Sequence, residues 1–397
     1  MPEYPVPAAA PAISAVAAGI PLHHPATLIG WDVGGAHLKA ALLRGGELVD
    51  VAQWPCPLWL GQAQLATALA QARARWPGML ETARHGVTMT AEMVDLFLDR
   101  ASGVAALAEQ LALALTGQVD PLPDRLVFYA GAVQADGAGA PDGATPAAAA
   151  PASWLSRADA VLHWRSLASA NYLASASLAA AVLGDGLLVD IGSTTSDLIA
   201  LRHGAVCSLG QGDAGRLATG ELIYQGVVRT PLMALAQRVP FDGHSVHVMN
   251  ELFATTADVY RLTGELAPAH DQQPTADGGA KTQTATCQRL ARLLGRDAAD
   301  ASPEQWLALA GHWRERQLGE LAQALQGVAW AARLGSAAPL VAAGCGAFLV
   351  PDLARDLGRP CLSFSTDVLG LAGPGPLADW AQVCAPAVAV ALLLAAA

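Results

Sequence analysis

One short pattern occurs twice in the chain, and this duplication constrains the fold more than any other feature. Each copy is an apolar strand ending in Asp-x-Gly, followed by a loop of small residues, a second strand, a tight turn and a third strand. The copies span residues 28–46 and 187–204, and Asp32 of the first corresponds to Asp190 of the second, 158 residues later. A matched pair of such hairpins predicts two similar domains that face each other across a cleft.

The expected fold class is α/β, with two RNase-H-like domains of the actin-like ATPase type flanking a central cleft. This layout resembles that of the actin, sugar-kinase and heat-shock-ATPase superfamily. The expected segments are an Ala/Pro-rich N-terminal arm (1–26), a first domain (27–184) with a flexible Ala/Gly/Pro-rich loop (134–152), a second domain (185–380) with a helical insertion (about 215–335), and a C-terminal helix (381–397) that packs back toward the first domain. Apolar spacing predicts helices at 65–76, 104–116, 217–228, 250–260 and 287–295.

The loops that follow the two Asp-x-Gly strands have the composition of a phosphate-binding site. Glycine has no Cβ, so backbone N–H groups in such loops can approach phosphate oxygens closely. Hydroxyl side chains add further donors, and a lysine seven residues after Asp32 adds a point positive charge. The predicted phosphate-binding residues are Gly34, Gly35, Lys39, Gly192, Ser193, Thr194 and Thr195.

Three carboxylates accompany these loops and would be out of place beside bare phosphate. Asp32, Asp190 and Asp197 make sense if a magnesium ion, usually with its waters, lies between carboxylate and phosphate. Mg²⁺ is therefore the expected cofactor, and Lys39 and Asp190 are also expected to act in catalysis. ATP is an expected ligand only if the chain is a kinase or a hydrolase.

A third glycine-containing turn lies near the end of the second domain. Residues 339–349 predict a buried strand, a turn with Gly344 and Gly346, and a helix. In this superfamily that position closes over a nucleoside, so the two glycines are candidates for a nucleoside pocket. Such a turn is also common between a strand and a helix, and both interpretations stay open. The sequence contains no P-loop motif and no complete dinucleotide-binding motif.

One acidic residue, Glu92, lies where a carboxylate could act as a catalytic group. Residues 86–90 predict a short strand, and Glu92 lies at its exit. Ligands of parallel α/β sheets meet the carboxyl ends of the strands, which favours Glu92 as a general base. The alternative is an acid in the first turn of a helix, favoured there by the helix dipole. His244 and His247 are expected to be an exposed loop pair, because no third metal ligand is identifiable.

Bulk composition argues against several function classes. A formal net charge of −11 without a Lys/Arg cluster argues against a nucleic-acid partner. The six cysteines are scattered singly, so neither a zinc site nor a disulfide framework is expected. The first 26 residues lack the features of a secretory signal, and the apolar end at 384–397 is too short to span a bilayer. We expect a cytoplasmic protein with small-molecule partners and no membrane partner; the oligomeric state stays open, with a homodimer as one alternative.

Several segments together resemble the hydantoinase/oxoprolinase branch of this superfamily and, more narrowly, the enzymes of methanofuran biosynthesis. The narrower family comprises an aryl-ether synthase of methanogens and its relatives in methylotrophs, often labelled tetrahydromethanopterin-linked C1-transfer pathway proteins. The segments that carry the resemblance are Met89-Thr90-Ala91-Glu92-Met93, Ala168-Ser169-Ala170-Asn171, Asp190 to Asp197, Leu222 to Pro231 and Phe253 to Val259.

This resemblance runs from about Leu28 to about Arg296, with a looser match to the end, and the combined string is more specific than any single motif. Two positions depart from the family pattern. Tyr172 stands where the family has Trp, and no Pro precedes Asp277-Gly278. Both departures concern the acceptor substrate more than the chemistry.

The resemblance implies a transferase. In the family reaction, an (aminomethyl)furanmethanol diphosphate is attacked by the phenol oxygen of a glutamylated tyramine, pyrophosphate leaves and a furanylmethyl aryl ether forms. The expected partners are therefore a furan diphosphate and a glutamylated tyramine or tyrosine. Glu92 would take the phenolic proton. The expected substrate-binding residues are Asn171, Arg229, Asp258 and Lys281.

Two other functions are compatible with the same hairpins. One is an ATP-dependent small-molecule kinase or a hydantoinase/oxoprolinase-like hydrolase. The other is a nucleotide-binding regulatory protein without turnover, because this fold hosts such proteins as well. Consumption of ATP, consumption of a furan diphosphate, or nucleotide binding without turnover would distinguish the three.

Overall fold

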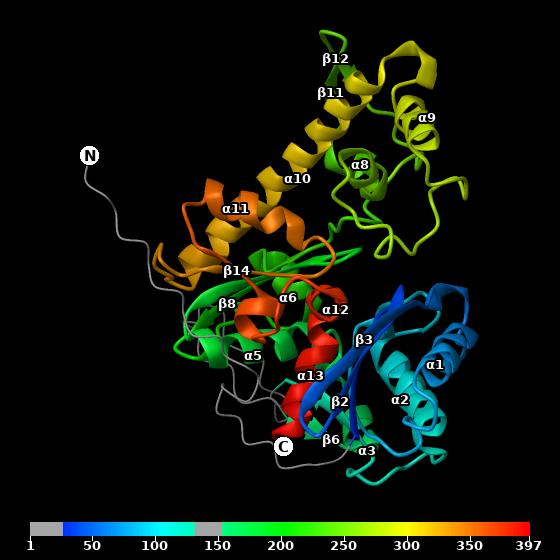
Figure 1. The fold of residues 1–397 in the computed structure, drawn as a ribbon, viewed down its shortest axis with the longest axis vertical. Helices are drawn as coiled ribbons and strands as arrows, with labels where there is room; N and C mark the ends of the chain where they lie inside the picture. The colour runs from blue at the N-terminus through cyan, green and yellow to red at the C-terminus, as the bar shows by residue number, and fades with distance from the viewer. Residues whose placement is uncertain (1–26, 132–152) are drawn as a thin grey trace.

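A computed structural model describes residues 27–131 and 153–397 of the chain. The predicted N-terminal arm and the predicted loop at 134–152 lie outside these ranges. The described part contains two six-stranded sheets, a small two-stranded hairpin and a helical lobe that extends beyond the second sheet (Figure 1).

The first sheet is built from β1 (Thr27–Val33), β2 (His37–Arg44), β3 (Glu47–Pro55), β4 (Arg84–Met89), β5 (Leu126–Ala130) and β6 (Ser153–Leu155). Its order is β3-β2-β1-β4-β5-β6. The first three strands form an antiparallel meander, and β4 and β5 follow parallel to β1. The helices of this domain are α1 (Ala63–Arg75), α2 (Arg100–Thr116), α3 (Arg157–Leu162) and α4 (Trp164–Leu167). The helices predicted at 65–76 and 104–116 are thus confirmed.

The second sheet is built from β7 (Gly186–Ile191), β8 (Ser196–Arg202), β9 (Ala205–Val206), β10 (Leu222–Ile223), β13 (Leu340–Ala343) and β14 (Cys361–Ser363). Its order is β10-β8-β7-β13-β14, with β9 paired to β8. As in the first sheet, an antiparallel hairpin carries the Asp-x-Gly motif, and two further strands run parallel to the first strand of that hairpin. The duplicated sequence pattern therefore folds as two similar units, and the expected α/β class is confirmed.

Two apolar helices, α5 (Asn171–Leu183) and α13 (Ala385–Ala395), form the core between the sheets (Figure 1). Close approach of α13 to β1 depends on Gly30, because a Cβ there would lie 2.2 Å from the carbonyl oxygen of Ala387. Within the described residues, no single helix is long and apolar enough to cross a membrane. The pair formed by α12 (Pro376–Val383) and α13 has the required length and composition, but it bends by 95°.

The helical lobe and the short elements around it complete the fold (Figure 1). Its elements are α6 (Gly212–Thr219), α7 (Leu232–Leu235), β11 (Arg238–Phe241), β12 (His244–His247), α8 (Thr256–Thr263), α9 (Gln283–Leu293), α10 (Pro303–Ala331) and α11 (Val350–Asp356). The short 3₁₀ helices are η2 (Leu58–Leu60), η3 (Ala91–Met93), η4 (Ala298–Asp300) and η5 (Ala347–Leu349), and η6 (Phe364–Val368) is a π-helix. The helix predicted at 287–295 corresponds to α9.

Three predictions in this lobe need correction. The helix predicted at 217–228 is wrong, because α6 ends before Gly220, which takes the left-handed conformation typical of helix ends. The helix predicted at 250–260 begins only at Thr256, where Thr255 and Asp258 form a capping box. His244 and His247 are exposed but lie on β12, not in a loop. Within the described ranges, no three His, Cys, Asp or Glu side chains group as a metal site would require.

Candidate active site

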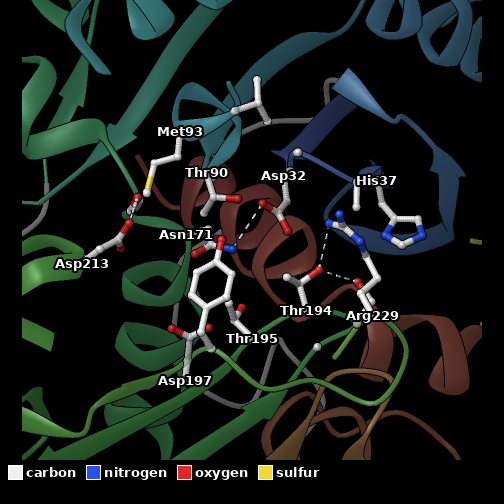
Figure 2. Close-up of a pocket in the computed structure, with 18 of the residues that line it drawn as sticks. Asp32, His37, Thr90, Met93, Asn171, Thr194, Thr195, Asp197, Asp213 and Arg229 are labelled. Carbon is white, nitrogen blue, oxygen red and sulfur yellow. Dashed lines mark hydrogen bonds between the residues drawn. The ribbon is translucent and has the colours of Figure 1, made fainter. Parts of the chain in front are cut away.

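A cleft of about 440 Å³ lies between the two Asp-x-Gly hairpins and is lined by residues of both domains (Figure 2). This volume suits a small-molecule ligand. The residues predicted from the sequence that line it are Asp32, Gly34, Gly35, Lys39, Asn171, Gly192, Ser193, Thr194, Thr195, Asp197 and Arg229. Those not predicted as site residues are Ala36, His37, Trp59, Thr90, Met93, Val94, Asp95, Ser169, Asp213, Arg216, Leu222 and Tyr224.

The first hairpin loop is closed by its own backbone. The amide of Gly34 donates to the carbonyl of His37 at 3.0 Å, so this N–H group holds the turn. Gly35 must lack a side chain for a different reason: a Cβ there would lie 2.8 Å from Cγ1 of Val94. The absence of a side chain at Gly35 therefore lets the loop pack against Val94, which directly follows η3.

The second hairpin loop is fixed by a neighbouring segment, residues 226–229, which we call the brace. The amide of Val227 donates to the carbonyl of Gly192 at 3.0 Å, and the amides of Val228 and Arg229 donate to that of Ser193 at 3.1 and 2.9 Å. A Cβ on Gly226 would lie 2.4 Å from the carbonyl carbon of Ser193, so the brace can approach only with glycine there. These contacts hold the loop that carries the hydroxyls of Ser193, Thr194 and Thr195.

A buried polar network anchors the brace to the helical lobe. The carbonyl of Gly226 accepts from Thr256 Oγ1 at 2.9 Å and from Gln317 Nε2 at 3.1 Å. The hydroxyl of Tyr260 donates to Gln317 Oε1 at 2.6 Å. Helices α8 and α10 thus determine where the second loop lies.

Lys39 lies among buried carboxylates at the base of the cleft. Its Nζ is 3.6 Å from Asp32 Oδ2. Asp190 is buried and does not line the cleft, although it is near enough to interact electrostatically with Lys39. Burial raises the pKa of Asp190 to about 7, against the opposing effect of Lys39, and the charges of Asp197 and Asp32 add to the increase. Burial also raises the pKa of Asp32, and Lys39 again opposes this.

The carboxylate oxygens at the bottom of the cleft suit a hard cation. Asp32 and Asp190 are two buried carboxylates with one lysine between them, and further positive charge would favour their ionised forms. Asp197, in contrast, already forms an ion pair with Arg216, whose guanidinium also lies 3.7 Å from the ring centroid of Tyr172. Carboxylate oxygens are the ligands that Mg²⁺ prefers, commonly one or two of them together with phosphate oxygens and water.

Arg229 is a cation in the cleft without an acidic partner in the described part of the chain. Its guanidinium lies 4.4 Å from the ring centroid of Trp59 and donates to Thr194 Oγ1 at 3.4 Å. Burial lowers its pKa, and the Tyr224 phenol opposes this. A half-buried cation beside a hydroxyl-rich loop is suited to bind an anionic ligand.

Two aromatic side chains also face the cleft, Trp59 from η2 and Tyr224 from the second domain. They are 37% and 58% exposed, which leaves apolar ring surface available to a flat ligand. Sequence reasoning missed both as site residues. Tyr224 lies inside the segment 222–231 that carried the family resemblance, which was a usable signal, whereas nothing in the local sequence singled out Trp59.

Glu92 follows β4 as predicted, but its carboxyl group does not open into the cleft. The residue is 1% exposed and lies in η3. Ser169 Oγ, which does line the cleft, is 2.9 Å from Glu92 Oε1. The direct contact between Glu92 and a ligand that the strand-exit position predicts is therefore wrong, because Glu92 is buried and does not line the cleft.

Asp258 and Lys281 do not line the cleft. Asp258 is buried and accepts hydrogen bonds from Arg289 Nε at 2.8 Å and from Arg261 at 2.7 Å. Lys281 pairs with Asp271 at 3.0 Å. Both predicted substrate contacts are corrected: these charges are used inside the helical lobe to hold the loop at 264–282.

That loop reaches the first domain. Gln273 Nε2 donates to the carbonyl of Ala36 and to His37 Nε2, both at 3.0 Å. Gln272 Oε1 accepts from Gln53 Nε2 at 3.2 Å. The charges of Asp258 and Lys281 thus affect the cleft indirectly, through the position of this loop.

Gly344 and Gly346 have a packing role, and neither lines the cleft. Gly344 has a φ of +82°, and a Cβ there would lie 2.3 Å from the carbonyl oxygen of Ile191. The amide of Gly346 donates to that same oxygen at 2.8 Å. The close approach of this turn to the end of β7 explains both glycines without a nucleoside.

Comparison with known proteins adds a family and named relatives. The family model described as hydantoinase/oxoprolinase matches residues 154–375. The chain is 25% identical over 68% of its length to the (4-{4-[2-(gamma-L-glutamylamino)ethyl]phenoxymethyl}furan-2-yl)methanamine synthase of Methanocaldococcus jannaschii, covering 72% of that protein. It is 31% identical over 31% of its length to the synthase of the same name from Methanococcus vannielii, covering 55% of that protein.

Solved structures show more distant likenesses. Acetone carboxylase is 12% identical with a TM-score of 0.49, over 84% of this chain and 68% of that chain. Component A of (R)-2-hydroxyglutaryl-CoA dehydratase from Acidaminococcus fermentans is 12% identical with a TM-score of 0.43, over 94% and 100%. Both TM-scores lie below 0.5.

Proposed function

This chain belongs to the hydantoinase/oxoprolinase family, and from that premise we propose that it is an enzyme that joins a furanylmethyl diphosphate to a phenol. The product is a furanylmethyl aryl ether and pyrophosphate, as in methanofuran-type biosynthesis. The observation that carries the proposal is Arg229, a cation without an acidic partner in the described residues, between a hydroxyl-rich loop and an exposed aromatic ring. The names of the curated relatives support the same reaction class.

The reaction balances without a redox step. The phenol oxygen attacks the methylene carbon attached to the furan, and a C–O bond forms. The C–O bond to the diphosphate breaks, its electron pair leaves with pyrophosphate, and the phenolic proton goes to a base. Two kinds of assistance are therefore needed: stabilisation of the leaving diphosphate and acceptance of one proton.

We assign the diphosphate to the base of the cleft. Lys39 and Arg229 are the cations there, and the hydroxyls of Ser193, Thr194 and Thr195 are the neutral donors. Positive groups that are already in place where charge develops stabilise a leaving anion at little reorganisation cost. A magnesium ion held near Asp32 and Asp190 would neutralise further charge on the diphosphate when it is bound.

We assign the aromatic rings of the substrates to Trp59 and Tyr224. Flat ligands gain from stacking on exposed aromatic surface. Asn171, which also lines the cleft, is 3.4 Å from Asp32 Oδ1 through its Nδ2 and orients that carboxylate. In this arrangement the acceptor approaches over the aromatic side chains, while the diphosphate stays at the two hairpin loops.

The test measures pyrophosphate release and ether formation by the full chain, with the (aminomethyl)furanmethanol diphosphate and candidate phenols in the presence of Mg²⁺. Tyramine, glutamylated tyramine and glutamylated tyrosine would identify the acceptor class. We expect release only when a phenol is present and loss of release with a chelator. ATP consumption instead would favour a kinase or hydrolase, and nucleotide binding without turnover would favour a regulatory protein; either result contradicts the proposal.

A further inference from the structure

One wall of the cleft holds two carboxyl groups bridged by a single hydroxyl, which we call the Glu92–Ser169–Asp213 cluster. Ser169 Oγ lies 2.9 Å from Glu92 Oε1 and 3.0 Å from Asp213 Oδ2. Arg100 pairs with Asp213 Oδ2 at 3.0 Å. Ser169 and Asp213 line the cleft, and Glu92 lies behind Ser169. The serine hydroxyl therefore connects the cleft to Glu92.

Ser169 is held in a backbone conformation that serine seldom adopts. It lies in the turn between α4 and α5 with a φ of +53°. Strain of this kind persists only where the surroundings fix it, and it concentrates at functional sites. Here the conformation places the hydroxyl between the two carboxyl groups.

Proton counting shows what this cluster is built to do. A hydroxyl has one proton, so with both carboxyl groups ionised one of the two short contacts contains no proton. Asp213 has Arg100 to stabilise its ionised form. If Glu92 takes up a proton, it can donate to Ser169 Oγ while Ser169 donates to Asp213, and both contacts become hydrogen bonds. The cluster is therefore better satisfied with one additional proton.

A second observation identifies Glu92 as the group that takes up this proton. Its other oxygen, Oε2, is buried and has no hydrogen-bond partner among the described residues. An ionised carboxylate in such a position is costly. Burial accordingly raises the pKa of Glu92. Asp213 adds to the increase, and the backbone amide of Glu92 itself, Ser169 and Arg100 oppose it.

We propose that Ser169 is a catalytic residue that touches the acceptor and passes the phenolic proton to Glu92. This rests on the proposed aryl-ether reaction. Glu92 is ionised before the reaction and accepts from Ser169. The phenol O–H bond breaks and its proton moves to Ser169 Oγ, while the proton of Ser169 moves to Glu92 Oε1. The phenol oxygen forms its bond to the methylene carbon, and the electron pair of the broken C–O bond leaves with pyrophosphate. Ser169 ends as a neutral hydroxyl, now donating to Asp213.

The kinetic test compares Ser169→Ala with Ser175→Ala. Ser175 is a buried serine on α5 whose hydroxyl donates to the carbonyl of Tyr172 at 3.3 Å. Pyrophosphate release is measured with tyramine and with ring-fluorinated tyramines of increasing acidity. We expect Ser169→Ala to lower kcat for tyramine by about 10²-fold, with a smaller loss for each more acidic phenol and no change in KM for the diphosphate. Glu92→Gln should show the same trend, and Ser175→Ala should behave as the unmodified protein.

Two outcomes would overturn the relay: full activity of Ser169→Ala with tyramine, or an equal loss with every phenol, which indicates a structural role. If the unmodified protein releases pyrophosphate with no phenol at all, the proposed function fails instead. Infrared spectroscopy then still tests the cluster. A carboxylic-acid band that forms at a pH above the usual range of glutamate, is lost in Glu92→Gln and is shifted in Ser169→Ala supports a cluster that accepts a proton. A band that forms only in the ordinary range of glutamate, near about 4.3, overturns it.

Discussion

The two hairpins share a sequence pattern, but they are held in place in different ways. The second loop receives three backbone hydrogen bonds from the brace at 226–229. Both loops close on themselves, Gly34 on His37 and Gly192 on Thr195. The first loop also receives backbone hydrogen bonds from Cys56 and Leu58 of its own domain, and the side chain of Gln273 ties it to the helical lobe. The loops differ in how the helical lobe contacts them. At the second loop the contact is a contiguous backbone segment, and at the first it is one side chain, in which more torsion angles are free to change.

This difference shows that the duplicated sequence determines topology, whereas rigidity comes from segments outside the repeat. The braced loop carries the hydroxyls and adjoins Arg229, so it can present donors without rearrangement. The backbone hydrogen bonds to the first loop come from its own domain, and its contact with the helical lobe is a single glutamine. We therefore expect the first loop to shift relative to the helical lobe on ligand binding more than the second.

The largest effect should come from the two equivalent aspartates. Asp32→Asn and Asp190→Asn should each lower pyrophosphate release by roughly 10²–10³-fold, the range seen when a charge-stabilising group is removed. The fold should persist, because burial already raises the pKa of both carboxyl groups and a neutral amide has the same shape. Thermal melting checks the fold, and the exposed Asp124→Asn is the control. Near-normal turnover of either variant without added metal would contradict equivalent roles.

The sheets and the hairpin loops were predictable from the sequence because they depend on local signals. Strand alternation, Asp-x-Gly endings and small loop residues occur within each copy, and the topology follows from repeating them. The same holds for α1 and α2, whose apolar spacing is regular.

The remaining site residues depend on contacts between distant segments, which one sequence does not reveal. Asp258 and Lys281 were expected in the cleft as available charges, but arginines and an aspartate elsewhere in the lobe pair with them. Glu92 was correctly predicted to follow a strand. Its hydrogen bond with Ser169, which lies 77 residues later in the sequence, could not be predicted from the strand itself. The helix expected at 217–228 failed because Gly220 ends it, a local signal that the apolar pattern outweighed.

Removing the brace should have the next largest effect. Gly226→Ala would place a Cβ 2.4 Å from the carbonyl carbon of Ser193, which is backbone and cannot rotate away. We expect a loss of about 1–3 kcal/mol in unfolding free energy and a marked rise in KM for the diphosphate. Gly311→Ala in α10 meets no atom within 4 Å and should stabilise the protein slightly. If Gly226→Ala were as stable as Gly311→Ala, the second loop would not be the rigid one.

A smaller effect on KM for the diphosphate is expected from the buried network that anchors the brace to the helical lobe. Tyr260→Phe removes the donor to Gln317 Oε1 and leaves that buried amide oxygen unpaired. The expected cost is about 1–3 kcal/mol in unfolding free energy, measured by denaturant titration. KM for the diphosphate should rise less than in Gly226→Ala, because Thr256 and Gln317 still hold the carbonyl of Gly226. An unchanged midpoint would show that the helical lobe does not support the brace.

Releasing the first loop from the helical lobe should affect KM for the diphosphate less than either brace substitution. Gln273→Ala removes two hydrogen bonds to the first hairpin, with an expected cost of about 0.5–1.5 kcal/mol each. KM for the diphosphate should change little if this loop adjusts on binding. Hydrogen exchange of the amides at 34–37 should become faster, while exchange at 192–195 stays the same. Faster exchange in both loops would mean that they move as one unit.

The smallest effect at neutral pH concerns the histidine in that contact. Burial lowers the pKa of His37 to about 3, with further lowering by Lys39 and Arg229. An unfolded histidine titrates near 6.5, so between these values the unfolded chain binds the extra proton. The stability that depends on neutral His37 is therefore fully present above about pH 6.5 and is lost as pH falls toward 3.

Glutamine does not titrate, so His37→Gln should change the unfolding free energy little at neutral pH. Below about pH 6.5, the unfolding free energy of this variant should fall less steeply with decreasing pH than that of the unmodified protein. His85, whose pKa burial lowers to about 4, should account for much of the remaining slope. An unchanged acid dependence in His37→Gln would show that the first loop opens before this histidine titrates.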